Sequence, residues 1–260
     1  MALHSSLVEL AHQAPRLDVP AAARGVLAEA QELLRNALLH REDEVELAAW
    51  FSRLIIDVVR SPAVSSPVLL TGAVARGDAL PTIPVTWIGE DPNLGQLLRS
   101  ADLDGHSVDE SSVARRVDAG LRVGAGGEEA LLAEALQKRP PAVTLIDGLP
   151  DRNAPVDIQA HLLSPIAAIA RWAAPAPRPT LDRISIAVER GLFRASEGEV
   201  LSAAWQTGMS IEARRWMDHA TNRECRFDSL PALHRTAYGA ASRGVAATFT
   251  AIAARECAAD

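Results

Sequence analysis

The sequence predicts an α/β plus α fold, in which a small mixed sheet flanked by helices is followed by an all-helical region. Apolar residues recur at helical spacing over residues 20–60 and again from residue 156 onward. Two short apolar and β-branched runs, residues 68–71 and 83–88, flank a turn that contains two glycines. Aromatic residues make up only 4% of the chain, and abundant alanine and leucine are typical of helical proteins.

Composition narrows the class of protein. Hydrophobic residues make up 48% and charged residues 23% of the chain, which is typical of a globular protein. A formal net charge of −7 argues against a broad nucleic-acid surface. Cys225 and Cys257 lack metal-ligand spacing, so buried thiols in a reducing cytosol are expected. With neither a signal peptide nor a membrane span in the sequence, we expect a cytoplasmic protein, and the dominance of arginine over lysine is typical of GC-rich actinobacterial coding.

The chain begins with helices. Residues 20–38 and 44–60 each carry an apolar stripe at helical spacing, with Leu27, Leu34, Phe51 and Ile55 among its members. Two helices packed as a hairpin would bury both stripes, whereas one long helix would leave its stripe in water. We assign residues 1–62 to an N-terminal helical segment and expect a break at residues 61–67.

The run at residues 68–71 leads into a turn that begins at Gly72 and ends with Arg76, Gly77 and Asp78. The second run follows within about a dozen residues, so the segment reads as strand, turn or short helix, then strand. A glycine turn at the end of a strand points backbone N–H groups at one spot, which suits a phosphate. An ordinary strand-ending turn explains the same residues, and a short motif alone is weak support for function.

This turn resembles the nucleotidyltransferase signature of the DNA polymerase β superfamily, which reads Gly-Ser-x-(Ala/Gly)-Arg-Gly-(Glu/Asp). Five positions match it in order and spacing, and Ala73 stands in the place of the serine. The matching residues are Gly72, Ala75, Arg76, Gly77 and Asp78. The resemblance implies phosphate or nucleotide binding by Gly72, Ala73, Arg76 and Gly77.

The resemblance does not extend to the residues that bind metal ions in the superfamily. The signature continues with Asp-x-Asp on the next strand, where this chain has Pro84 and Thr86, or Ile83 and Val85 if the register slips by one residue. In the superfamily this pair of carboxylates holds two Mg²⁺ ions that orient a nucleoside triphosphate. We therefore predict no metal site; Mg²⁺ and a nucleoside triphosphate are expected only if the protein is active.

Residues 63–153 form the expected nucleotidyltransferase-like domain. Helices are predicted from residue 92 and over residues 113–121 and 128–138, and a polar loop with a solvated His106 over residues 102–112. Residues 142–147 predict a third strand, next to the first two, that ends in Asp147. The resemblance places a third aspartate at such a position, which makes Asp147 and Asp78 the candidate catalytic residues. A turn-forming aspartate before Gly148 is an equally good explanation of Asp147.

The last part, residues 154–260, is predicted to be a separate helical domain. Helices are expected over residues 156–173, bent near Pro165, then over 180–190, 196–215 and 229–257. The order of its short motifs is similar to the C-terminal DUF294 type, the putative nucleotidyltransferase substrate-binding domain of bacterial signal-transduction proteins. The motifs are Asp157-Ile158-Gln159, Leu162 to Ile166, Ile169-Ala170-Arg171, Thr180 to Ile184, Gly191-Leu192 and Ser229-Leu230-Pro231 with Arg235. Gln159 departs from the family, which has lysine there.

We expect a cleft between these two domains, lined by Gly72, Arg76, Gly77, Asp78 and Asp147. Arg171 and Arg183 are weaker candidates for this cleft, because arginines on amphipathic helices are usually solvated or paired at the surface.

Three functions are consistent with this pattern. The first is a degenerate nucleotidyltransferase-like protein that regulates by binding a nucleotide or a partner protein without transfer chemistry. The second is an active Mg²⁺-dependent enzyme that modifies a protein, as the PII-uridylylating relatives do, using displaced carboxylates at Asp78, Asp91 and Asp147. The third is a helical adaptor without a ligand.

Overall fold

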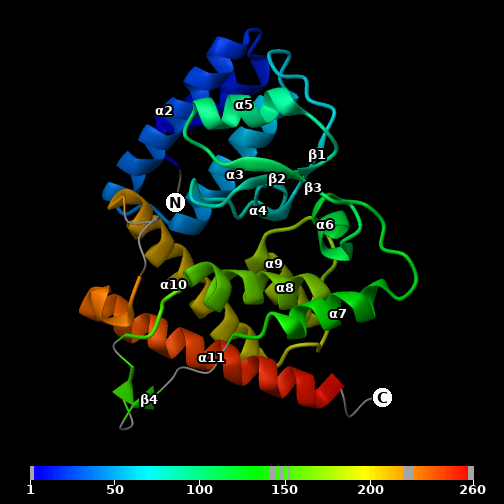
Figure 1. Cartoon of the computed structure of the whole chain (residues 1–260), viewed down its shortest axis with the longest axis vertical. Helices are drawn as coiled ribbons and strands as arrows, with labels where there is room; N and C mark the ends of the chain where they lie inside the picture. The colour runs from blue at the N-terminus through cyan, green and yellow to red at the C-terminus, as the bar shows by residue number, and fades with distance from the viewer. Residues whose placement is uncertain (1–2, 141–144, 147–148, 152, 220–224, 257–260) are drawn as a thin grey trace. The chain divides into compact units, whose positions relative to one another are not determined.

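The chain divides into two compact units, as a computed structural model shows (Figure 1). The structure describes residues 3–140, 145–146, 149–151, 153–219 and 225–256. Unit 1 comprises Met1–Val123 together with Ala176–Pro179, and unit 2 comprises Gly124–Pro175 and Thr180–Asp260. The assignment of domains to residues 1–62, 63–153 and 154–260 stays a prediction.

Unit 1 begins with a layer of helices. These are α1 (Ser5–Gln13), the 3₁₀ turn η1 (Ala14–Arg16), α2 (Pro20–Leu39) and α3 (Glu44–Arg60). The predicted hairpin is confirmed, because α2 and α3 pack against each other and are joined by a short turn that ends before Asp43. The Asp43 carboxylate accepts from the backbone N–H groups of Val45 and Glu46, both at 2.9 Å, and so begins α3.

A three-stranded mixed sheet follows, as predicted. Its strands are β1 (Leu69–Thr71), β2 (Val85–Ile88) and β3 (Gly105–Val108), in that spatial order. β1 and β2 are antiparallel with Thr71 opposite Thr86, and β2 and β3 are parallel with Thr86 opposite His106. The short helix α4 (Gly72–Arg76) leaves β1 directly. Residues 68–88 therefore form neighbouring strands joined through the motif turn.

β3 corrects the prediction of a polar loop over residues 102–112. The strand lies at the edge of the sheet, and its central side chains, His106 and Ser107, are exposed, so the sequence lacks the alternation that marks a half-buried strand. Its glycine has a packing role. A Cβ at Gly105 would lie 2.5 Å from Leu98 Cδ1 and 3.1 Å from Trp87 Cζ3, so only glycine allows β3 to approach this closely.

Two helices flank the sheet. α5 (Pro92–Ser100) packs on the face that carries Trp87, since a Cβ at Gly95 would lie 3.8 Å from Trp87 Cη2. α6 (Val113–Asp118) lies beside β1, where the Thr71 hydroxyl donates to the Arg115 carbonyl at 2.7 Å. Thr71 and Thr86 project from the face opposite Trp87, because side chains alternate along a strand.

Unit 2 is helical, as predicted. Its α-helices are α7 (Gly127–Gln137), α8 (Ser164–Ala173), α9 (Thr180–Glu189), α10 (Ala195–Met217) and α11 (Ala232–Glu256), with a 3₁₀ turn η3 (Phe227–Ser229) before α11. The two longest, α10 and α11, run side by side (Figure 1). Trp205 of α10 and Phe249 of α11 are both fully buried in the core of this unit.

The third strand predicted over residues 142–147 is placed elsewhere. Leu145–Ile146 form β4, which pairs antiparallel with β5 (Leu149–Pro150) in a separate two-stranded sheet of unit 2. β4 therefore does not belong to the sheet of β1 and β2, whose third strand is β3. Pairing between segments so close in the chain is local, and nothing in a short apolar run specifies a distant partner.

The helix predicted from residue 156 begins with a π-helix, η2 (Gln159–Leu163), that continues into α8. The Ser164 N–H donates to the Gln159 carbonyl, five residues earlier. The Asp157 carboxylate accepts from Ala160 N at 2.8 Å and so starts the segment. Pro165 has no N–H to donate and lies at the second residue of α8, where a helix tolerates proline.

Candidate functional site

The motif turn has the backbone that its glycines predict. Gly72 has φ +67° and Gly77 has φ +85°, both in the left-handed region. Gly77 ends α4 as a left-handed cap, and the Asp78 N–H donates to the Ala73 carbonyl at 2.9 Å. This pattern is the usual glycine-terminated helix end, so the Arg-Gly-Asp portion closes a single helical turn.

Gly72 lies against the residue that replaces a metal ligand. A Cβ at Gly72 would lie only 2.6 Å from Thr86 Oγ1. The Thr86 hydroxyl donates to the Thr71 carbonyl at 3.2 Å. The neutral Thr86 side chain therefore closes the start of the turn, at one of the two positions where the resemblance puts a carboxylate.

Arg76 lies in an ion-pair network inside unit 1. Its Nε donates to Asp78 Oδ2 at 2.9 Å, and its Nη1 donates to Asp118 Oδ2 at 2.7 Å. Arg76 is 8% exposed, and Asp78 and Asp118 are each 2% exposed. One cation thus binds two carboxylates from the motif turn and from the end of α6.

The network fixes the charge of Arg76. Burial alone would lower the pKa of its guanidinium, but the negative charges of Asp118 and Asp78 and their hydrogen bonds outweigh burial and raise the pKa. An arginine that is buried and held by two carboxylates is poorly placed to bind an incoming phosphate, because the phosphate would have to compete with both. Its geometry is that of a residue that stabilises the turn.

Asp118 was missed by the sequence analysis. It lies 42 positions from Arg76 in the chain, at the end of a helix whose sequence carries no motif. The local feature of Asp118 in the sequence is that it precedes two small residues, Ala119 and Gly120. Many surface aspartates share this feature. A contact over this separation requires the three-dimensional structure.

The remaining predicted residues have varied settings. Ala73 is buried and offers no hydroxyl, whereas Gly72 and Gly77 are partly exposed. Asp91 caps α5, because its Oδ1 accepts from the N–H groups of Asn93 and Leu94, both at 3.0 Å. Asp147 lies outside the residues that the structure describes. The cleft expected between the domains stays a prediction.

Arg171 and Arg183 correct the expectation of solvated arginines. Arg171 on α8 is 6% exposed, and Arg183 on α9 is completely buried. Both have interaction partners within the protein. Burying a guanidinium is costly unless it is paired, so each belongs to the interior of unit 2.

Within the described part of the chain, no three His, Cys, Asp or Glu side chains are grouped so that they could hold a metal ion. The strand beside β2 offers His106 opposite Thr86, and the positions at 84 and 86 hold proline and threonine. A lone imidazole and a neutral hydroxyl do not match the oxygen-rich octahedral shell of Mg²⁺.

Comparison with known families gives one match. Residues 129–248 match the family model DUF294_C, described as a putative nucleotidyltransferase substrate binding domain. This segment is similar to that family. The match confirms the resemblance expected for the C-terminal part of the chain. The matched DUF294_C segment begins in α7 and ends in α11, so it lies almost entirely within unit 2.

Comparisons with curated proteins and with solved structures give no match. The helices in the described part of the chain include none that is long and apolar enough to cross a membrane.

Proposed function

We propose that this chain is a degenerate nucleotidyltransferase-like protein that regulates by binding and does not transfer a nucleotide. The observation that carries the proposal is the Arg76–Asp78–Asp118 network, because it turns the charged end of the motif into a buried structural element. Pro84 and Thr86 support it, since neither offers the carboxylate that a two-metal mechanism needs. The DUF294_C match supports a substrate-binding role for unit 2.

The ligand under this proposal is a nucleotide or a partner protein. A nucleotide would depend on backbone N–H groups around Gly72, because Arg76 is occupied by its carboxylates. Such binding would be weaker than in an enzyme whose metal ions share the phosphate charge.

The test combines binding and turnover. Isothermal titration with ATP and UTP, with and without Mg²⁺, measures binding, and a labelled-nucleotide assay measures transfer. We expect no transfer, and any nucleotide binding should be insensitive to Mg²⁺. Robust Mg²⁺-dependent transfer would overturn the proposal.

The second candidate is an active Mg²⁺-dependent enzyme that uses displaced carboxylates at Asp78, Asp91 and Asp147; the ion pair of Asp78 with Arg76 and the helix cap formed by Asp91 count against those two. In that case Asp147→Asn abolishes turnover, and Asp91→Asn, which keeps the cap, leaves it unchanged. The adaptor alternative predicts a melting temperature that no nucleotide in a panel changes.

A further inference from the structure

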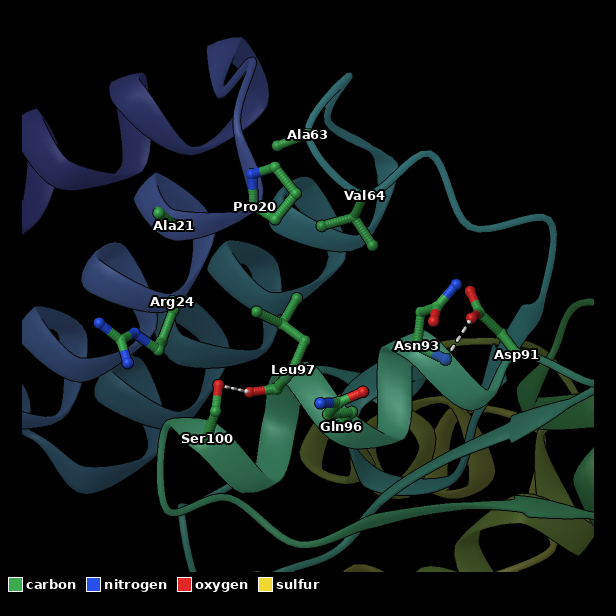
Figure 2. A pocket seen from close by; sticks show the side chains of 10 residues that line it. All are labelled: Pro20, Ala21, Arg24, Ala63, Val64, Asp91, Asn93, Gln96, Leu97 and Ser100. Atoms are coloured by element: carbon green, nitrogen blue, oxygen red, sulfur yellow. Dashed lines mark hydrogen bonds between the residues drawn. The ribbon is translucent and has the colours of Figure 1, made fainter.

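A groove in unit 1 lies apart from the motif turn. It has a volume of 510 Å³ and runs between the start of α2, the loop after α3, and α5. Figure 2 shows Arg24 and Ser100 at one end, and Asp91 and Asn93 at the other. Between these ends the groove is lined mostly by apolar residues, Pro20, Ala21, Ala63, Val64 and Leu97, together with Gln96.

The two ends of the groove carry opposite charges. Arg24 has no ion-pair partner among the described residues, and its side chain is exposed. At the other end the Asp91 carboxylate uses Oδ1 for both of its cap hydrogen bonds, which leaves Oδ2 free of them. An occupant that complements both ends has a negative group near Arg24 and a positive group near Asp91.

The length of the groove indicates which class of molecule could bind in it. Asp91 and Ser100 are nine residues apart on one helix, so at 1.5 Å per residue the groove is roughly 14 Å long. The two charges of a free amino acid are far closer together than this. An extended peptide advances about 3.4 Å per residue, so about four residues reach from end to end.

An extended segment is the shortest chain that spans this length, since an α-helix of the same length, at 1.5 Å per residue, would need about nine residues. The wall also suits an extended chain. Asn93 and Gln96 present exposed carboxamides one helical turn apart, and each has a donor and an acceptor for a peptide backbone.

We propose that this groove binds an extended segment of a partner protein, about four residues long, with an acidic side chain at the Arg24 end, apolar side chains over Leu97 and Val64, and a basic side chain at the Asp91 end. The proposal goes beyond the degenerate-nucleotidyltransferase function and does not depend on it, since it involves none of the motif residues.

The test is a nuclear magnetic resonance titration of the ¹⁵N-labelled full chain with two capped tetrapeptides, Glu-Leu-Leu-Arg and its reverse, Arg-Leu-Leu-Glu. Both are used because the groove does not fix the direction of the chain. We expect one of them to cause saturable shifts at the amides of residues 20–24 and 91–100. Shifts elsewhere, or no saturable shifts with either peptide, would overturn the proposal.

Variants sharpen the test. Arg24→Glu should weaken binding about tenfold, because an attraction becomes a repulsion. Arg16→Glu makes the same charge change at an exposed site outside the groove and should leave the affinity unchanged. Replacing the peptide glutamate by lysine should restore binding to the Arg24→Glu variant, and a failure to restore it would count against the assigned orientation of charge.

A mixture of free glutamate and arginine serves as the small-ligand control. Equal shifts from this mixture would show a site for small zwitterions and overturn the peptide proposal. Neither result bears on nucleotide binding or transfer, which are measured separately, so the two proposals can fail independently.

Discussion

Arg76 holds two carboxylates in the interior of unit 1, and this arrangement determines what its loss would do. Arg76→Ala removes an ion-pair partner from Asp78 and from Asp118, each of which is 2% exposed. Breaking a buried pair by removing one partner costs about 3–5 kcal/mol. We expect a loss of this size in the free energy of unfolding, measured by urea denaturation.

Arg53→Ala is the matched control, because Arg53 pairs with Asp57 at 2.8 Å on the same unit, but its side chain is 70% exposed. Its loss should cost less than about 1 kcal/mol. Equal costs for the two variants would show that the Arg76 network does not stabilise unit 1.

Gly72 gives a second prediction about single residues. Alanine at position 72 must adopt φ +67° and places its Cβ 2.6 Å from Thr86 Oγ1, so Gly72→Ala should lower the free energy of unfolding by about 1–3 kcal/mol. Gly25→Ala, in the middle of α2 with nothing within 4 Å, should instead raise it by about 0.5–1 kcal/mol. Thermal denaturation of both variants checks the difference in sign.

Tyr238 is the only tyrosine in the chain, so its ionisation can be followed directly by absorbance. The side chain is 5% exposed and lies 2.6 Å from His161 Nδ1. Burial raises the pKa of its hydroxyl to about 12. We expect the tyrosinate band of the folded protein to have a midpoint near this value, and that of the urea-unfolded chain near about 10.

The sign of the accompanying stability change follows from linkage. A group whose pKa is higher in the folded state stabilises that state below its unfolded pKa and loses this effect as pH rises. The free energy of unfolding should therefore fall between about pH 10 and about 12. A folded-state midpoint near that of the unfolded chain would contradict the burial of Tyr238.

At the scale of elements, the sequence predicted those helices whose apolar stripe faces the core. Four predicted members of the stripes of α2 and α3, Leu27, Leu34, Phe51 and Ile55, are at most 1% exposed. β3 was not predicted, because an edge strand with an exposed His106 has no such stripe. The π-helix at Gln159–Leu163 was not predicted, because hydrogen bonds from each N–H to the carbonyl five residues earlier leave almost the same apolar spacing as in an α-helix.

The packing of α10 on α11 includes a charged contact that the sequence did not indicate. The helix predicted from residue 196 begins one residue earlier, at Ala195, and Glu197 accepts from the Arg194 N–H at 2.8 Å. Glu197 also accepts from both terminal nitrogens of Arg255, at 2.5 and 2.9 Å. The start of α10 is thereby joined to the end of α11.

This contact predicts a dependence on acid. Partial burial works to raise the pKa of Glu197, but the hydrogen bonds from Arg255 and Arg194 outweigh it and lower the pKa. A carboxyl with a lowered pKa stabilises the folded state above its unfolded value and loses this effect as pH falls. Glu197→Gln should cost about 1–2 kcal/mol at neutral pH and less below about pH 4, measured by denaturant titration.

Glu134→Gln is its control within unit 2. Glu134 pairs with Lys138 on one helix, with side chains 31% and 42% exposed, so its removal should change stability by less than about 0.5 kcal/mol at any pH. A pH dependence as large for this variant would mean that the α10–α11 contact is not special.

At the scale of the whole molecule, the secondary structure of the motif could be predicted from the sequence, whereas the contacts of its charged side chain could not. The order of strand, turn and strand over residues 68–88 was predictable, because glycines and β-branched runs act locally. The state of Arg76 was not, because it depends on Asp118, 42 positions away. The turn could therefore be predicted from the sequence, whereas the burial of its charges could not.

The two units differ in whether a single fragment of the chain can contain all of their residues, and this difference gives a last prediction. All of unit 2 lies within residues 124–260, together with the matched segment 129–248. Unit 1 also needs Ala176–Pro179, which a fragment of residues 1–123 lacks. In that missing segment, Pro179 faces Gly77 and Pro177 faces Gly120, each 3.7 Å from where a Cβ would lie.

We expect the fragment of residues 124–260 to unfold cooperatively with a helical circular-dichroism spectrum, because it contains its whole core. The fragment of residues 1–123 should also fold, but with a free energy of unfolding lowered by about 1 kcal/mol, since the exposed Pro177 and the partly exposed Pro179 bury little apolar area. In the full chain, Pro177→Ala with Pro179→Ala should lower the stability of unit 1 by a similar amount, measured by hydrogen exchange of α4 and α6. If residues 124–260 fail to fold alone, the core of unit 2 is incomplete and its helices depend on unit 1.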